Sequence, residues 1–94
     1  MDQLRLDQFS DAIGQAFEVP IGDQCFSLEL KRAEASQVTS LREHGSFSLY
    51  WLGPFEPILP QATYEMRHGG QSYWIFIVPI GRDESGTTYE AVFN

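Results

Sequence analysis

The chain has 94 residues, which suffice for one domain, so we expect a single domain over residues 1–94. Its 13 acidic and 6 basic residues give a formal net charge of −7, and such a field repels a phosphate backbone, which argues against nucleic acid as a partner. The chain has one cysteine, no visible signal peptide and no apolar run near the ~20 residues of a membrane span, so we expect a cytoplasmic protein without membrane insertion.

One short helix is expected at residues 7–13. Phe9 and Ile13 lie one helical turn apart, which places both side chains on the same face. Gly14 follows at the position where a glycine commonly ends a helix. We expect Phe9 and Ile13 to close one end or edge of a sheet.

Six segments have the period-two pattern or the composition of β-strands, at residues 16–21, 25–31, 46–52, 62–68, 73–80 and 87–94. The first is predicted to be an edge strand, because Pro20 cannot donate to a ladder. The second could continue to Ala35, and residues 36–45 are predicted to form a long, mobile loop. Most links are short and contain no helical crossover, which indicates antiparallel pairing.

A sheet of six strands in so short a chain tends to curl. We therefore expect a mainly β fold, either a small six-stranded antiparallel barrel or a two-layer sandwich, with one short N-terminal helix. The segment from Tyr73 to Ile80 is apolar, aromatic or proline throughout, which predicts a strand buried on both faces. The rest of the chain supplies cover for one face, so the other face is expected to meet something outside the chain.

Few residues could carry catalysis or bind a metal. His44, His68 and Cys25 are the only histidine and cysteine residues, and they lack the spacing of zinc ligands. We therefore expect no catalytic residue, no metal and no cofactor, and hence no enzyme. An enzyme that uses His68 with Cys25 or Glu65 stands as a lesser alternative.

Large aromatic and apolar residues gather at two places in the sequence: Tyr50, Trp51, Leu52 and Phe55, and then Tyr73 and Trp74. If they are exposed, they mark a binding surface. The leading interpretation is a non-enzymatic interaction or structural module that binds a protein partner or a second copy of itself. Packing of these residues in the core is the first alternative. A barrel that binds a small molecule, with a mouth lined by Trp51, Tyr64 and Trp74, is the second.

Eight residues are predicted to have structural roles: Gly53, Pro54, His68, Gly69, Gly70, Pro79, Gly81 and Asn94. Gly53 and Pro54 set a turn at a strand end, and Gly69-Gly70 is a two-residue hairpin signal. His68 is expected to hydrogen-bond the backbone of that hairpin. Asn94 is expected to close the ladder of the last strand through its side chain.

A series of short motifs runs through the second half of the chain: Phe47-Ser48-Leu49, Gly53-Pro54, Leu59-Pro60-Gln61, Thr63-Tyr64, His68, Phe76-Ile77-Val78-Pro79, Gly81 and Tyr89-Glu90-Ala91-Val92-Phe93-Asn94. This series resembles an uncharacterised bacterial family of small β domains. The family is a domain of unknown function, so the resemblance implies no catalytic residues. It also implies an association with phage-tail-like or tail-collar proteins.

Overall fold

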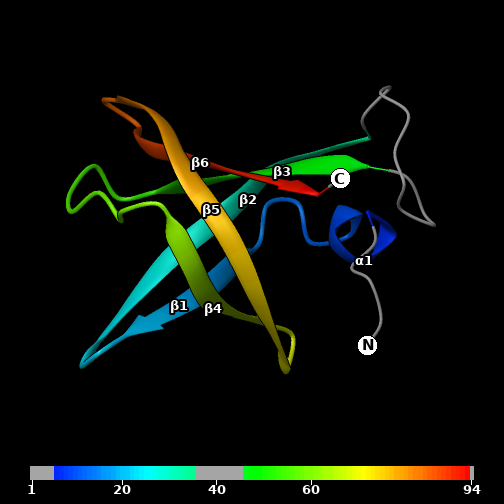
Figure 1. Cartoon of the computed structure of the whole chain (residues 1–94), viewed down its shortest axis with the longest axis horizontal. Coiled ribbons are helices and arrows are strands. Elements are labelled where there is room, and N and C mark those ends of the chain that lie inside the picture. The colour runs from blue at the N-terminus through cyan, green and yellow to red at the C-terminus, as the bar shows by residue number, and fades with distance from the viewer. Residues whose placement is uncertain (1–5, 36–45, 94) are drawn as a thin grey trace.

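Apolar side chains alternate along the strands, and the strands close into a barrel around them. The computed structural model describes residues 6–35 and 46–93, and its elements in that part of the chain are α1 (Asp7–Ser10), β1 (Ala16–Ile21), β2 (Gln24–Ala35), β3 (Phe47–Gly53), β4 (Ala62–His68), β5 (Gln71–Asp83) and β6 (Gly86–Phe93) (Figure 1). The strand order around the barrel is β1-β2-β3-β6-β5-β4, with antiparallel neighbours. The predicted antiparallel barrel is confirmed, and the sandwich alternative is not needed. The predicted loop at residues 36–45 and the predicted role of Asn94 lie outside the described residues.

β2 is long enough to pair with two different neighbours. Its residues 24–29 pair with β1 and its residues 29–35 pair with β3. A bulge between Leu30 and Arg32 lies close to the change of partner. Because a bulge bends a strand and increases its twist, it allows β2 to turn the corner that a closed barrel requires.

β5 turns a second corner in the same way. Residues 71–77 pair with β4 and residues 78–83 pair with β6, with a bulge between Pro79 and Gly81. Ile75 and Ile77 point into the core and are buried.

The other face of β5 is open, since Trp74 is 68% exposed and Phe76 is 52% exposed. The predicted burial of this strand on both faces is therefore wrong. The barrel has one interior, so a strand in its wall has only one face to bury.

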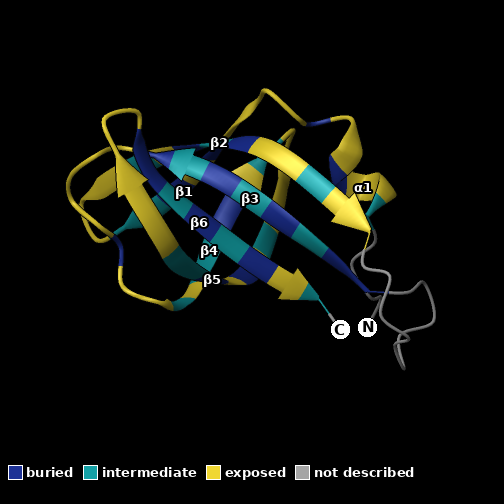
Figure 2. Cartoon of the chain, turned by 90° about the horizontal axis from the view of Figure 1, so that it is seen from above, coloured by how far each residue is buried: buried dark blue, intermediate teal, exposed yellow. Residues whose placement is uncertain are grey.

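The core combines inward side chains from the six strands of the described residues with two from the α1 region and one from the segment after β3: Phe9, Ala12, Phe17, Val19, Leu28, Leu30, Phe47, Leu49, Trp51, Leu59, Met66, Ile75, Ile77, Tyr89 and Ala91. Figure 2 shows the resulting alternation of buried and less buried residues along β3 and β6. The core therefore fills the space that a ligand-binding barrel would leave open.

α1 closes one end of the barrel but is shorter than predicted. The helix spans Asp7–Ser10, and a turn over residues 11–14 follows it. In this turn Ala12 is buried whereas Ile13 is 46% exposed, so the predicted inward position of Ile13 is wrong. The buried Phe9 closes this end together with Ala12, and the ring centroid of Phe9 lies 5.2 Å from that of Tyr73.

The segment at residues 54–61 closes the opposite end of the barrel (Figure 1). Leu59 is buried there, and its backbone N–H donates a hydrogen bond to Tyr89 Oη at 2.9 Å. Tyr64 Oη donates to the carbonyl oxygen of Pro60 at 2.6 Å. Two tyrosines from the barrel wall therefore hold this segment over the core.

Replacing Tyr89 by phenylalanine should lower the free energy of unfolding by about 1–3 kcal/mol, because it leaves the buried N–H of Leu59 without an acceptor. Urea denaturation followed by circular dichroism measures the loss. Tyr64→Phe is the matched control. It removes the hydrogen-bond donor to the Pro60 carbonyl, but Pro60 is exposed, so its carbonyl can bind water instead. Equal losses in the two variants would contradict the proposed importance of the buried bond.

Candidate functional site

Two aromatic side chains stand side by side on the outer face of β5. Trp74 and Phe76 lie two residues apart on the same side of the strand, and both are largely exposed. We call this pair the β5 aromatic face. Exposed residues of this size are unusual on a small barrel that already has a filled core, which makes this face the first candidate for a contact surface.

Carboxylates flank the β5 aromatic face on both neighbouring strands. On β4, Glu65 lies opposite Trp74 in the register. On β6, Glu90 lies opposite Val78, which follows Phe76 on the same side of β5. The face is therefore an apolar strip with an acidic group on each side.

The structure separates the six residues predicted as one interaction surface. Trp51 is fully buried and Tyr73 packs against the core, so neither side chain forms an exposed surface. The proposal for Trp51 is wrong because the odd-numbered residues of β3 point into the barrel. Phe55 is 45% exposed, but the guanidinium carbon of Arg82 lies 3.9 Å from its ring centroid and covers one side of the ring.

Tyr50 and Leu52 lie on the outer face of β3 and are half-buried. The guanidinium carbon of Arg32 lies 4.2 Å from the ring centroid of Tyr50. A hydrogen bond with the Glu90 side chain raises the pKa of Tyr50, and burial of the phenol raises it further. Tyr50 is thus engaged by charged neighbours, which leaves Trp74 as the member of the predicted set with the most open side chain.

The predicted ligand mouth does not form either. Trp51 of β3 lies in the core, whereas Trp74 points outward from the outer face of β5. Tyr64 is half-buried and holds the carbonyl of Pro60. These three aromatic residues therefore line no common opening.

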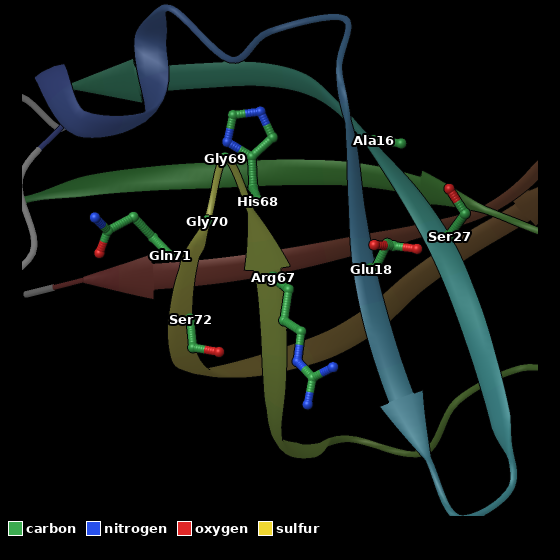
Figure 3. Close-up of a pocket in the computed structure, with 9 residues that line it drawn as sticks. All are labelled: Ala16, Glu18, Ser27, Arg67, His68, Gly69, Gly70, Gln71 and Ser72. Carbon is green, nitrogen blue, oxygen red and sulfur yellow. The ribbon is translucent and has the colours of Figure 1, made fainter.

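A hollow of about 510 Å³ lies where β1 meets β4. It is lined by nine residues: Ala16, Glu18, Ser27, Arg67, His68, Gly69, Gly70, Gln71 and Ser72 (Figure 3). β1 pairs with β2 along its whole length, but its register with β4 is the single pair Glu18 and Arg67. The strand predicted to be an edge thus closes the barrel, although only through this narrow contact.

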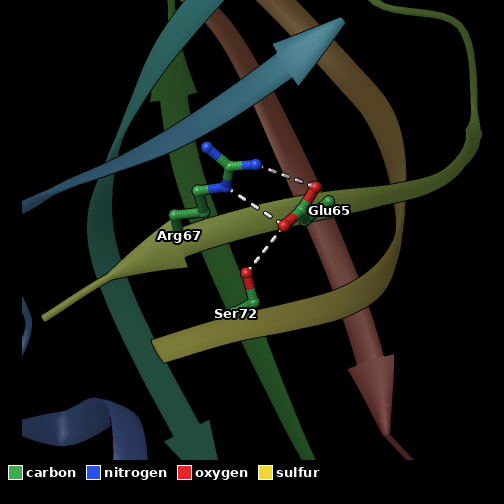
Figure 4. A network of polar contacts seen from close by, with 3 residues as sticks. All are labelled: Glu65, Arg67 and Ser72. Carbon is green, nitrogen blue, oxygen red and sulfur yellow. Dashed lines mark hydrogen bonds and ion pairs between the residues drawn. The ribbon is translucent and has the colours of Figure 1, made fainter. Parts of the chain in front are cut away.

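Arg67 is held by a network on the outer face of β4 and β5 (Figure 4). Its Nε and Nη2 donate to the two carboxylate oxygens of Glu65 at 3.0 and 3.4 Å, and Ser72 Oγ donates to Glu65 Oε2 at 2.7 Å. The bond from Arg67, followed by that from Ser72, lowers the pKa of Glu65. Glu65 is therefore a stably ionised partner of Arg67 rather than a free acid or base.

His68 points the other way from Arg67, toward α1 and the barrel interior (Figure 3). Its Nε2 lies 2.6 Å from Gln15 Oε1, and its ring stacks on that of Phe17 with centroids 4.6 Å apart. The predicted bond from His68 to the hairpin backbone is thus replaced by a bond to Gln15. Cys25 is an exposed residue of β2, and neither Cys25 nor Glu65 is a partner of His68 within the described part of the chain.

No group of three His, Cys, Asp or Glu side chains comes together as a possible metal site among residues 6–35 and 46–93. His44 lies outside these ranges. Within the same residues, no helix has the length and apolar character needed to cross a membrane.

The sequence interpretation missed several surface residues, for two different reasons. The outward position of Phe76 could have been predicted, because the two-residue turn at Gly69-Gly70 sets a register that pairs it with the outward Thr63. Glu18 and Arg67 are far apart in the chain and meet only when the barrel closes, so no local sequence signal joins them.

Comparison with protein-family models matches residues 4–93 to a domain of unknown function, DUF6916. Searches of curated proteins and of solved structures found no match.

Proposed function

Since the chain belongs to the DUF6916 family, whose function is unknown, we propose its role from its own surface: a non-enzymatic module that binds another protein through the β5 aromatic face. The observation that carries this proposal is the exposure of Trp74 and Phe76 next to each other on the wall of a barrel with a filled core. Exposed aromatic side chains with few rotatable bonds are the residues that dominate many protein interfaces.

Charge decides which partner the face fits. The chain has a formal net charge of −7, and Glu65 and Glu90 stand on either side of the aromatic strip. A partner with an apolar patch bordered by lysine or arginine would bury the aromatic rings and pair with Glu90, whereas Glu65 is already paired with Arg67. Two copies of this chain would instead bring like charges together, so a different protein is favoured over a homo-oligomer.

The closed barrel also favours contact through side chains. A strand in the middle of a wall already has both neighbours, so β5 offers no free backbone edge for an added strand. From the resemblance seen in the sequence, we further propose that the partner belongs to a larger bacterial assembly of the phage-tail-like type, reached from the cytoplasm.

The test compares Trp74→Ser with Ile58→Ser, a matched removal of an exposed apolar side chain from the segment at residues 54–61. A partner captured from the native host is purified, and its Kd for each variant is measured by titration calorimetry. We expect Trp74→Ser to raise the Kd at least tenfold, about 1.4 kcal/mol, with Ile58→Ser near the unsubstituted protein. We also expect the affinity to fall with added salt.

Two results would overturn this proposal. The first is an equal Kd for the two variants. The second is a stable homodimer that Trp74→Ser dissociates, measured by light scattering, because it would assign the face to a second copy of the chain. Circular dichroism shows that the variants are folded, and surface substitutions of this kind change stability by only about 0.5 kcal/mol.

A further inference from the structure

The hollow at the junction of β1 and β4 adjoins the β5 aromatic face. Ser72 lines the hollow and lies on the same side of β5 as Trp74, two residues before it. Its volume of about 510 Å³ falls in the range of ligand pockets, about 300–1,000 Å³. A partner that covers Trp74 is therefore in a position to place a side chain in the hollow.

The pairing of β1 with β4 is limited on both sides of Glu18 and Arg67, and the hollow lies on the side of Gly69-Gly70. On one side of the pair Glu18 and Arg67, Pro20 has no N–H to donate. On the other side, β4 ends at His68 and the chain turns away at Gly69-Gly70. A Cβ added at either glycine would meet nothing within 4 Å, so this side of the junction is open space.

The charges around the hollow leave one carboxylate in excess. Arg67 is engaged by both oxygens of Glu65, which raises the pKa of Arg67 and compensates its charge. Glu18 has no hydrogen bond or ion pair with any described residue, and Arg67, with which it interacts electrostatically, is already engaged by Glu65. A positive group that enters the hollow would therefore find Glu18 unpaired.

The walls suit an organic cation better than a metal ion. Ala16, Gly69 and Gly70 offer small apolar surfaces for an alkyl stem, and Ser27 adds a hydroxyl acceptor beside Glu18. A metal ion would need more anionic or imidazole ligands than this hollow presents. We infer that the hollow binds an alkylammonium or guanidinium group. The inference rests on the proposed function for the source of that group, a lysine or arginine of the protein partner.

The experiment follows the backbone amides of Gly69 and Gly70 by ¹H–¹⁵N NMR during titration with N-acetyl-lysine N-methylamide. The glutamate and norleucine analogues are the anionic and neutral controls. The lysine probe should shift both amides with a Kd at least fivefold lower than either control. Glu18→Gln should abolish this preference, and Glu84→Gln, which removes a carboxylate at the opposite end of β5, should leave it intact. Equal binding of the three probes, or an unchanged preference in Glu18→Gln, would overturn the inference.

Two further measurements separate the possible outcomes. Titration with putrescine tests whether a free diamine is the source of the cation. A Kd for putrescine at least tenfold below that of the lysine probe would overturn the assignment to a side chain of the partner. Trp74→Ser should leave binding of the lysine probe unchanged, because Trp74 does not line the hollow. If Glu18→Gln leaves the lysine preference unchanged while Trp74→Ser still raises the Kd for the partner, the hollow is not a cation site and the proposed function stands. The reverse pattern would remove the proposed function and keep the hollow as a cation site.

Discussion

Replacing Gly86 by alanine is expected to lower the free energy of unfolding by about 3 kcal/mol or more, because it combines backbone strain with a steric collision. Gly86 has φ +138°, a conformation that residues with a side chain rarely adopt. An added Cβ would also strike the carbonyl oxygen of Gly53. That oxygen belongs to the backbone of β3, so relief of the collision would disturb the register between β3 and β6.

Gly81→Ala is the matched control for this substitution. Gly81 lies on the same β5–β6 ladder, has no positive φ, and an added Cβ would meet no atom within 4 Å. We expect this variant to stay within about 0.5 kcal/mol of the parent, or to gain slightly from a less flexible unfolded chain. Urea denaturation of both variants provides the measurement, and similar losses would contradict the steric explanation. The structural role predicted for Gly81 thus has no conformational requirement behind it, whereas Gly86 has one.

Phe17→Ala is expected to cost about 3–5 kcal/mol, the range for removal of a large aromatic side chain from a packed core. Phe17 is fully buried. Its ring lies within 6.4 Å, centroid to centroid, of four other rings: Phe9, Trp51, His68 and Tyr73. These rings come from α1 and three different strands, so they cannot all move inward to fill the cavity.

The same substitution on the outer wall provides the comparison. Phe76→Ala removes an identical side chain that is about half exposed, and we expect it to cost less than about 1 kcal/mol. Denaturation should be followed by circular dichroism, since Trp51 lies next to Phe17 and its fluorescence would respond to the cavity. A loss at position 76 as large as that at position 17 would show that β5 is covered on both sides after all.

The exposed face of β5 could have been identified from the sequence. The alternation in residues 62–68 places Glu65 outward, and the Gly69-Gly70 turn fixes the register of the hairpin. Residues directly opposite each other in an antiparallel pair share a face, so Trp74, opposite Glu65, must also point outward. The apolar composition of the strand does not reveal this orientation, because composition indicates that side chains can be buried but not which face of the strand they lie on.

Other features depend on contacts that the sequence does not encode locally. Ala12 is buried in place of Ile13 because α1 ends at Ser10. So short a helix is not stable by its own helix propensity, so its end depends on packing against the barrel. The hollow beside Glu18 follows from barrel closure between segments distant in the chain. The alternation of apolar residues therefore predicts the wall of the barrel well, but it does not predict its ends or its junction.

The narrow junction between β1 and β4 affects how the protein resists aggregation. Because a single register pair joins these strands, we expect the barrel to open there before any other pair of wall strands separates, which would expose two strand edges. Exposed edges invite pairing with other chains and aggregation. Pro20 on one edge and the charged Arg67 on the other are residues that discourage such pairing. The same proline that limits closure of the barrel thus also protects the opened chain from association.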